Sequence, residues 1–340
     1  MTRRLIVHDA GPGVSVQDLG RPGYLAFGLS RGGAADRLAV AEGAALLHQS
    51  EGLAALEMAG MGGSFEVSHD TRIALTGAPM RASVDGAPLA WNASHLLHAD
   101  SRLSIGAATR GVYGYLHLGG GIATTERLGA RSAHLAAGLG ALIAAGDDLP
   151  MGEDRTGAET GLVLPADDRF EGGAVRVVPG FQTGFFPDEE ITRFEATQFT
   201  RAARGNRMGV RFVDPDGEGF ASVAGLSVLS EVIVPGDIQI TGDGAPFVLM
   251  AECQTTGGYP RIGSVLPCDL PRVAQAQPGA QLRCRFVTPE EGLAAERAAE
   301  SARKGLRAKL DHLVRDPHDI RDLLSYQFIS GVTAGHDEET

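Results

Sequence analysis

Side chains that can bind an amide or an anion are concentrated in four glycine-rich segments of this 340-residue chain. In the first, GPGVSVQDLGRPGY (residues 11–24), Gln17, Asp18 and Arg21 lie among glycines and prolines that restrict the backbone. Such a segment can be a binding loop that presents an amide, a carboxylate and a guanidinium together. The alternative is a structural turn in which Asp18 and Arg21 pair with each other.

The second segment, SRGGAADRLA (residues 30–39), places two glycines just before Asp36 at the expected start of a helix. Gly32 and Gly33 would let backbone N–H groups approach an oxyanion, and a helix N-terminus favours negative charge. Asp36 can therefore act in catalysis near this point, or it can simply cap the helix.

The third segment, RGNRMGVR (residues 204–211), contains Arg204, Arg207 and Arg211 around a flexible glycine. Guanidinium groups bind planar carboxylates and phosphates through paired hydrogen bonds, so this cluster can capture an anion. The alternative is a solvated loop face.

The fourth segment, ECQTTGGYP (residues 252–260), presents Gln254 and Thr255, which can hydrogen-bond an amide in both directions. Tyr259 adds a stacking surface and a phenol, unless it lies in the core of a tight hairpin. Asp269 follows in RIGSVLPCDL (residues 261–270) as a weaker candidate.

Composition limits the classes of function. The net charge is -12, so we expect no nucleic-acid partner. No segment approaches the roughly 20 apolar residues of a membrane span, and no signal-peptide core is present, so we expect a cytoplasmic protein without a membrane partner. We expect no metal site, and we expect the odd, widely spaced cysteines (Cys253, Cys268 and Cys284) to be reduced.

Lysine is almost absent, since only Lys304 and Lys309 occur. No lysine follows a GxxxxG loop, so no Walker A phosphate loop is predicted, and none lies where biotin could be attached. An anionic substrate must then be held by arginine or by backbone N–H groups.

Short β-type runs separated by glycines indicate a mainly β barrel or sandwich rather than an α/β nucleotide fold. Two helices are predicted, at residues 37–48 and 289–316, the second as an appended arm. A polar stretch at residues 148–161 indicates a domain boundary near residue 165. A weak internal similarity suggests two copies of one barrel.

The polar segments also resemble, in the same order, those of the biotin-dependent carboxyltransferase-like family, which includes allophanate hydrolase subunit 2, the C subunit of bacterial 5-oxoprolinase and the carboxyltransferase region of urea amidolyase. The similar stretches are GPGVSVQDLGRPGY, GGAAD, YLHLGGGI, LGARS, GNRMGVR, VPGDIQI, QTTGGYP with CDL, and FISGVTAG at residues 328–335. The sequence departs from the family at Gly32–Asp36, where Ser-Gly-Ala-Met-Asp is usual, and at His48-Gln49, where Gly-Asn is usual.

The resemblance implies two tandem cyclophilin-like β-barrel domains, at residues 1–165 and 166–288, followed by a helical arm and tail at residues 289–340. It also implies a site in the cleft between the barrels. We expect the catalytic residues to be among Asp36, Arg207 and Tyr259. We expect the substrate-binding residues to be among Gln17, Arg21, Gly32, Gly33, Arg211, Gln254, Thr255 and Asp269.

Three functions follow from the resemblance. The first is the C subunit of an ATP-dependent 5-oxoprolinase, which opens the lactam of 5-oxo-L-proline to L-glutamate with sister subunits A and B, and in which the ATP can be bound by one of those partners. The second is a carboxyltransferase that moves a carboxyl group from carboxybiotin to urea or a related amide. The third is a regulatory binding protein of a sensor kinase, which would bind without turnover.

Overall fold

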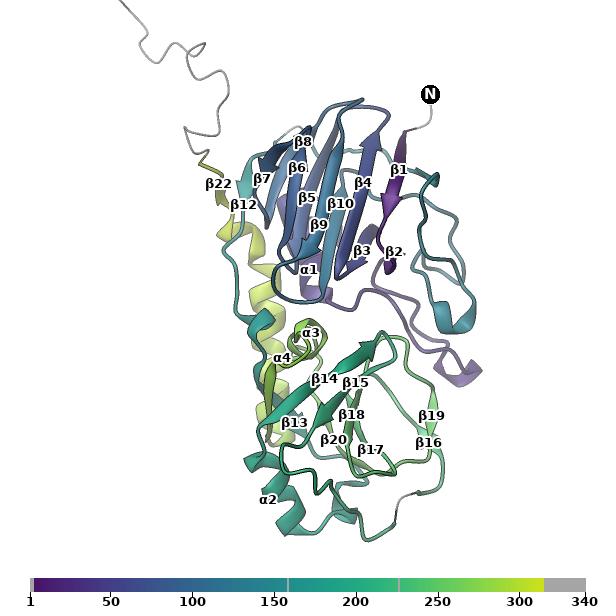
Figure 1. Cartoon of the computed structure of the whole chain (residues 1–340), viewed down its shortest axis with the longest axis vertical. Helices are drawn as coiled ribbons and strands as arrows, with labels where there is room; N and C mark the ends of the chain where they lie inside the picture. The colour runs from purple at the N-terminus through teal and green to yellow at the C-terminus, as the bar shows by residue number, and fades with distance from the viewer. Residues whose placement is uncertain (1–2, 158, 226, 315–340) are drawn as a thin grey trace, which may run out of the picture.

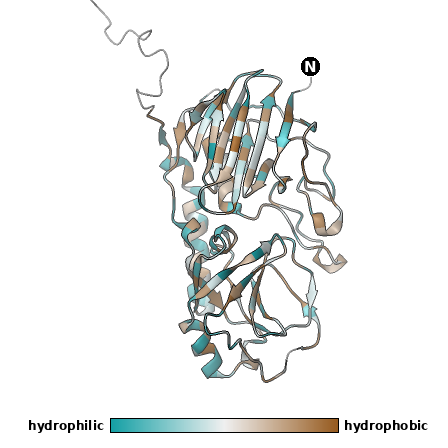
Figure 2. Ribbon diagram, viewed as in Figure 1, coloured by the Kyte–Doolittle hydropathy of each residue, from teal (hydrophilic) through white to brown (hydrophobic). Residues whose placement is uncertain are grey.

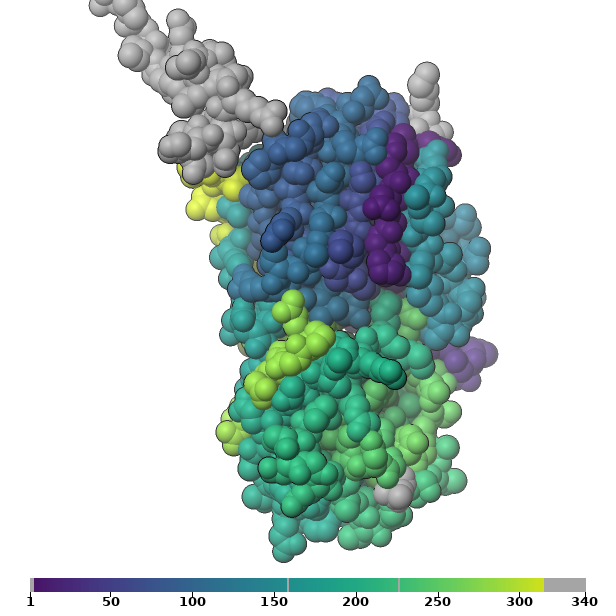
Figure 3. All heavy atoms as spheres, in the orientation of Figure 1, coloured from purple at the N-terminus to yellow at the C-terminus, as the bar shows by residue number. Residues whose placement is uncertain are grey.

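The computed structural model describes residues 3–157, 159–225 and 227–314, which form two β-rich halves beside one long helix (Figure 1). The expected tail segment at residues 328–335 lies outside the described residues. Figure 3 shows the two halves in contact across the middle of this face of the molecule. The mainly β class and the C-terminal helix predicted from the sequence are confirmed.

The first half is built from two sheets. In spatial order, one sheet consists of β11 (Asp148–Pro150), β1 (Arg4–Ala10), β4 (Met61–Val67), β9 (Leu103–Ala108), β6 (Met80–Val84) and β7 (Ala87–Leu89). The other consists of β2 (Val14–Gln17), β3 (Ala55–Ala59), β10 (Tyr113–Leu118), β5 (Thr71–Gly77), β8 (Ala93–Leu97), β12 (Leu162–Val163) and β22 (Asp311–His312).

Apolar side chains from both sheets of the first half share one core, with Leu5, Phe65 and Leu103 from one sheet and Leu56 and Leu116 from the other. These strands are hydrogen-bonded as two separate sheets, whereas the sequence predicted a barrel in each half. The layers are held together by side-chain burial, which needs no continuous backbone ladder between them.

The second half is a closed barrel. Its strands follow the order β13 (Gly173–Val178), β20 (Arg261–Val265), β17 (Asp237–Ile240), β18 (Pro246–Leu249), β15 (Gly209–Val213), β14 (Phe199–Asn206) and β21 (Gln281–Phe286), with a small separate sheet of β16 (Glu231–Val232) and β19 (Thr256–Gly257). Its core continues into the interface, where it includes Ala34, Tyr113 and Tyr115 of the first half.

Helices lie between and beside the two halves (Figure 1). The α-helices are α1 (Arg37–Leu46), α2 (Asp188–Ala196), α3 (Leu270–Gln275) and α4 (Pro289–Lys304), and the short 3₁₀ turns are η1 (Leu25–Phe27), η2 (Leu135–Ala137), η3 (Arg169–Glu171), η4 (Thr183–Phe185) and η5 (Leu306–Lys309). The predicted domain boundary near residue 165 lies between β12, which belongs to the first half, and β13, the first strand of the barrel.

The helix α4 starts at a capping box, in which the side chains of Thr288 and Glu291 bind each other's backbone N–H groups. Figure 2 shows a largely hydrophilic helix beside the two halves. The predicted helix over residues 289–316 is wrong at residues 305–314, and residues 315–316 lie outside the described residues. Gly305 weakens the helix, and the chain then turns so that Leu306 packs on α1 and β22 pairs with β12.

Candidate functional site

Arg207 reaches from the turn between β14 and β15 into the first half of the molecule. Its Nη1 pairs with Glu57 of β3, and its Nε lies 2.5 Å from Oε1 of Glu252. Its Nη2 donates to the Gly33 carbonyl at 2.6 Å and to Gln17 Oε1 at 3.3 Å. The side chain is 12% exposed, so Arg207 is a buried link between the halves.

The charge of Arg207 is neutralised by these carboxylates. Burial alone would lower the pKa of its guanidinium, but Glu57 and Glu252 outweigh burial and raise the pKa. The interpretation of Arg207 as a catalytic group that captures a substrate anion does not fit these contacts, because both carboxylates already occupy the guanidinium.

Glu57 extends the same network toward α1. Its Oε2 accepts from the Tyr115 hydroxyl at 2.7 Å and from Ala35 N at 2.8 Å. The Tyr115 oxygen in turn accepts from the backbone N–H of Asp36 at 2.8 Å. Buried hydrogen bonds of this kind fix the loop that precedes α1.

Asp36 caps α1, since its side chain accepts from Ala39 N at 3.0 Å. Its other oxygen accepts from Arg169 Nε and from Gln275 Nε2, each at 2.8 Å. Both oxygens are engaged and the residue is fully buried, so the cap is the role that the structure shows, and the catalytic role predicted for Asp36 does not fit. Arg169 also forms a bidentate pair with Glu42 at 2.9 and 2.6 Å.

Arg21 is buried beneath the loop of residues 124–134. Its Nε donates to the Arg127 carbonyl at 3.3 Å, and its Nη2 donates to the Ser132 carbonyl. Asp18 instead accepts from the backbone N–H groups of Gly20 and Arg131, so the Asp18–Arg21 pair considered above is wrong. These hydrogen bonds use carbonyls and not carboxylates, although Asp18 and Glu252 attract the guanidinium without a direct ion pair.

Three buried polar atoms near this loop have no hydrogen-bond partner within the part of the chain that the structure describes: Arg21 Nη1, Ser132 Oγ and His134 Nδ1. His134 Nε2 lies 2.8 Å from Ser30 Oγ, and its Nδ1 lies 3.9 Å from Glu252 Oε2. Leaving a buried polar group unpaired costs about 1–3 kcal/mol. Such atoms therefore indicate a place for a water molecule or a ligand.

Gly32 brings two of these groups together. Its backbone has a φ of 63°, and its N–H donates to the Ala251 carbonyl at 3.1 Å, which joins the loop to the barrel half. A Cβ atom at this position would lie 3.0 Å from His134 Cδ2 and 3.6 Å from Arg21 Nη1. A side chain at this position would crowd His134, so glycine lets the loop pack directly against His134 and Arg21.

We call this cluster the Arg21–His134 site, which comprises Arg21, Ser30, Gly32, Ser132, His134 and Glu252. Burial lowers the pKa of His134 although Glu252 opposes the effect, so the imidazole is neutral at pH 7. A neutral imidazole, a hydroxyl and a guanidinium offer both donors and an acceptor, which is the set that an amide group requires.

Among the predicted residues, Gln17, Arg21, Gly32, Gly33 and Arg207 are brought together by contacts between the halves. Gly33 has a φ of 83° and supplies its carbonyl to Arg207, rather than an N–H group to an anion. The buried amide of Gln17 donates to Ser15 Oγ and to the Ala133 carbonyl.

Other predicted residues lie apart from this cluster, because no described contact joins them to it. Gln254 is exposed, Thr255 supplies its carbonyl to Ile233 N, and Tyr259 is 44% exposed, so the core position considered for Tyr259 is wrong. Arg211 pairs with Asp243 at the surface. Asp269 binds the guanidinium and backbone N–H of Arg176, which occupies the carboxylate with a structural contact.

The sequence analysis missed Glu57, His134, Arg169 and Glu252. Glu57 is a single carboxylate in the otherwise apolar run ALEMA, and this pattern is a usable signal for a buried charge that needs a partner. His134 lies in an irregular loop whose sequence carries no comparable signal.

Among the described residues, no group of His, Cys, Asp or Glu has the arrangement of a metal site. None of their helices combines the length and the apolar character that spanning a bilayer requires.

The chain is similar to known proteins over most of its length. A family model described as "Carboxyltransferase domain, subdomain A and B" matches residues 27–287. The chain is 30% identical to the 5-oxoprolinase C subunit of Haemophilus influenzae over 86% of its own length and 94% of that protein. It is also 30% identical to the 5-oxoprolinase C subunit of Escherichia coli, over 84% and 92% of the two chains.

A solved structure shows the same fold. The urea carboxylase of Kluyveromyces lactis superposes with a TM-score of 0.78 at 22% identity, over 92% of this chain and 31% of that one. The extent of the family match, which covers both halves and the interface between them, shows that this chain belongs to the carboxyltransferase domain family, subdomains A and B.

Proposed function

We propose that this chain is the C subunit of an ATP-dependent 5-oxoprolinase, which opens the lactam of 5-oxo-L-proline to L-glutamate together with sister subunits A and B. The observation that carries the proposal is the match to two 5-oxoprolinase C subunits over 94% and 92% of their lengths. Agreement over nearly all of the length of these relatives is expected of the same kind of subunit. In contrast, the chain spans only 31% of the urea carboxylase.

The Arg21–His134 site supports the proposal chemically. A lactam presents a carbonyl oxygen, which accepts hydrogen bonds, beside an N–H group, which donates one. Arg21 Nη1 can donate to that oxygen and stabilise the negative charge that develops on it when the carbonyl is attacked. The unpaired Ser132 Oγ or His134 Nδ1 can accept from the lactam N–H.

ATP is a substrate of the proposed reaction, and we assign its binding to a sister subunit. The guanidinium of Arg207, which binds Glu252 of this site, is already neutralised by Glu57 and Glu252. Two carboxylates in the same network would repel a polyphosphate. The residues of the site therefore fit an amide better than a nucleotide.

The description of the family favours a second candidate, transfer of a carboxyl group from carboxybiotin to urea or a related amide. Here too the substrate nitrogen belongs to an amide-like group, and the same donors and acceptor would hold it. Carboxybiotin would be a co-substrate made elsewhere.

The test is to co-purify this chain with its sister subunits and to supply ATP with 5-oxo-L-proline. Formation of glutamate and ADP is expected. Carboxyl transfer to urea, when a biotin carboxylase and a biotin carrier are added, without lactam opening would replace the proposal with the second candidate. Binding without turnover in every combination would indicate a regulatory protein.

A matched pair of variants tests the site. His134→Gln is expected to lower kcat of the assembled enzyme by at least about tenfold, since an oriented acid–base or hydrogen-bonding group contributes on the order of 10²-fold. His98→Gln, which changes a histidine that is 65% exposed and paired with Asp70, should leave kcat unchanged. Equal activities of the two variants would remove His134 from the site.

A further inference from the structure

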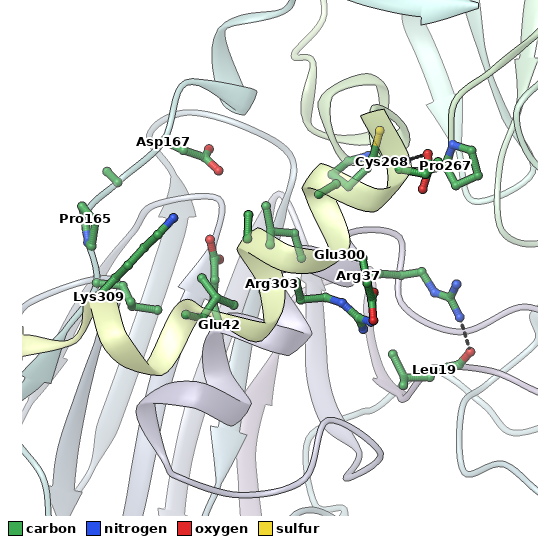
Figure 4. Close-up of a pocket in the computed structure, with 18 of the residues that line it drawn as sticks. Leu19, Arg37, Glu42, Pro165, Asp167, Pro267, Cys268, Glu300, Arg303 and Lys309 are labelled. Atoms are coloured by element: carbon green, nitrogen blue, oxygen red, sulfur yellow. Dashed lines mark hydrogen bonds and ion pairs between the residues drawn. The ribbon is translucent and has the colours of Figure 1, made fainter. Parts of the chain in front are cut away.

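A second site for a small molecule is indicated by a solvent-accessible cavity of about 780 Å³ between α1, α4, the linker after β12 and the segment before α3 (Figure 4). Its volume lies within the range of small-molecule sites, about 300–1,000 Å³. The lining shares no residue with the Arg21–His134 site, and the proposed function makes no use of it.

Two arginines at one side of the cavity are held by a single carbonyl. Arg31 Nε donates to the Leu19 oxygen at 3.0 Å, and Arg37 Nη2 donates to the same oxygen at 2.8 Å. Figure 4 shows the second of these bonds. A shared acceptor keeps the guanidiniums close to each other while their other N–H groups remain available.

Neither arginine has a carboxylate partner in the described ranges of the chain. The acidic residues that line the cavity are engaged elsewhere: Glu42 and Asp167 pair with Arg169, Glu296 accepts from Cys268 N, and Glu300 pairs with Arg303 and Lys304. The side of the cavity that Arg31 and Arg37 form therefore carries uncompensated positive charge.

Arg37 is exposed to solvent but lies close to other cations. Partial removal of its guanidinium from water, together with repulsion by Arg31 and Arg303, lowers its pKa to about 10. Arg37 is also the first residue of α1, where the helix dipole disfavours a cation. An anion bound between the two guanidiniums would relieve both effects.

We infer that Arg31 and Arg37 bind the oxyanion of a small organic acid, whose apolar part lies against Leu38, Pro271 and Leu306 in the same cavity. Paired guanidiniums suit the planar oxygens of a carboxylate and the tetrahedral oxygens of a phosphate. Both kinds of ligand present an oxyanion on a small molecule, and titration with each of them distinguishes a carboxylate from a phosphate.

The test is isothermal titration of the full chain with 5-oxo-L-proline and, separately, with inorganic phosphate. At least one probe is expected to bind at a site that is lost in the double variant Arg31→Gln/Arg37→Gln, whereas any 5-oxo-L-proline bound at the Arg21–His134 site remains. Loss of 5-oxo-L-proline binding alone in that variant would identify a carboxylate site, and loss of phosphate binding alone would identify a phosphate site. Absence of binding by both probes would overturn the inference.

The double variant Arg31→Gln/Arg37→Gln is expected to weaken binding on the order of 100-fold, because two charged hydrogen-bonding groups are lost. Its thermal unfolding temperature without ligand should equal or exceed that of the parent, since the repulsion and the unfavourable helix-end charge are removed. A merely structural pair of arginines would instead lower that temperature.

Arg81→Gln is the matched control, because Arg81 is an exposed arginine on β6 that does not line the cavity. It should bind the probe as the parent does. Undiminished binding by the double variant would overturn the inference. The measurement is of binding to this chain alone. Binding at the cavity can therefore be absent while the assembled enzyme opens the lactam, and it can be present while the assembled enzyme does not.

Discussion

At the scale of single residues, this protein stabilises buried charge through pairs that its sequence separates widely. Arg207 neutralises Glu57, 150 residues away, and Glu252, 45 residues away. Removing one partner of such a group leaves a buried charge without compensation. The free energy lost in this way is larger than the net contribution of the pair to stability.

Arg207→Ala is therefore expected to lower the free energy of unfolding by about 3–5 kcal/mol. Arg211→Ala, four residues along the chain, should cost less than about 1 kcal/mol because its pair with Asp243 is solvent-exposed. Urea unfolding of both variants measures the difference. Equal losses would show that the buried pairing is energetically unimportant.

His117 predicts the response to acid. It lies 2.8 Å from Thr76 Oγ1 beneath α1, and its burial lowers its pKa to about 3, against 6.5 in the unfolded chain. Both states are neutral above pH 6.5, so the stability is then complete. As the pH falls from 6.5 toward 3, the unfolded state binds the proton first and stability is lost.

At pH 4.5, two pH units below the unfolded pKa, the loss attributable to His117 should reach about 2–3 kcal/mol. The measurement is the free energy of unfolding of the parent and of His117→Gln between pH 7 and 4.5. The variant should lose less stability over this interval. A parallel decline in both proteins would contradict the assignment.

At the scale of elements, the loop between β2 and α1 positions both the Arg21–His134 site and the contact with Arg207. Its path depends on a close approach of two glycines. At Gly33, where φ is 83°, a Cβ atom would lie 2.6 Å from Gly20 N and 2.7 Å from Leu19 C. These are backbone atoms and have no room to move aside.

Gly33→Ala should consequently destabilise the protein more than Gly28→Ala does. Gly28 has nearly the same φ, 80°, but a Cβ atom there would have nothing within 4 Å. Gly28→Ala is expected to destabilise the protein only through the left-handed conformation, by about 1–2 kcal/mol. Gly33→Ala has the same cost and a further cost of about 1–3 kcal/mol from overpacking. Denaturant titration compares the two, and a larger loss at Gly28 would refute the role of the close approach.

At the scale of the whole molecule, α3 of the barrel half is joined to the first half by one amide. Gln275 Oε1 accepts from the N–H groups of Val112 and Tyr113, each at 2.9 Å. Its Nε2 donates to the Tyr113 carbonyl and to Asp36, each at 2.8 Å. Since the barrel core also continues through the interface, we expect the halves to unfold together.

Gln275→Ala would leave several buried groups unpaired, at about 1–3 kcal/mol each. The expected result is a lower unfolding temperature and a calorimetric transition that broadens or divides as the halves lose their coupling. Gln277→Ala, which removes a single bond to the Gly111 carbonyl, should retain one transition. A single unshifted transition for Gln275→Ala would show that this amide does not couple the halves.

Local features of this protein were determined by the sequence itself. The helix predicted from residue 37 is α1, and Asp36, at its expected start, is its N-cap. The glycines at positions 32 and 33 adopt the turn conformations that glycine favours. These features depend on interactions within a few residues, which propensity, capping and turn chemistry describe.

The tertiary structure alone decided how charges are paired and which predicted residues meet. Arg207 has the same neighbours in sequence whether it binds a substrate or two carboxylates, and only the fold brings Glu57 and Gln17 to it. Likewise, Arg169 of the linker meets Asp36 and Glu42 only when the halves pack. Most of these contacts join residues more than 100 positions apart, and that of Arg207 with Glu252 spans 45, so local patterns cannot fix them.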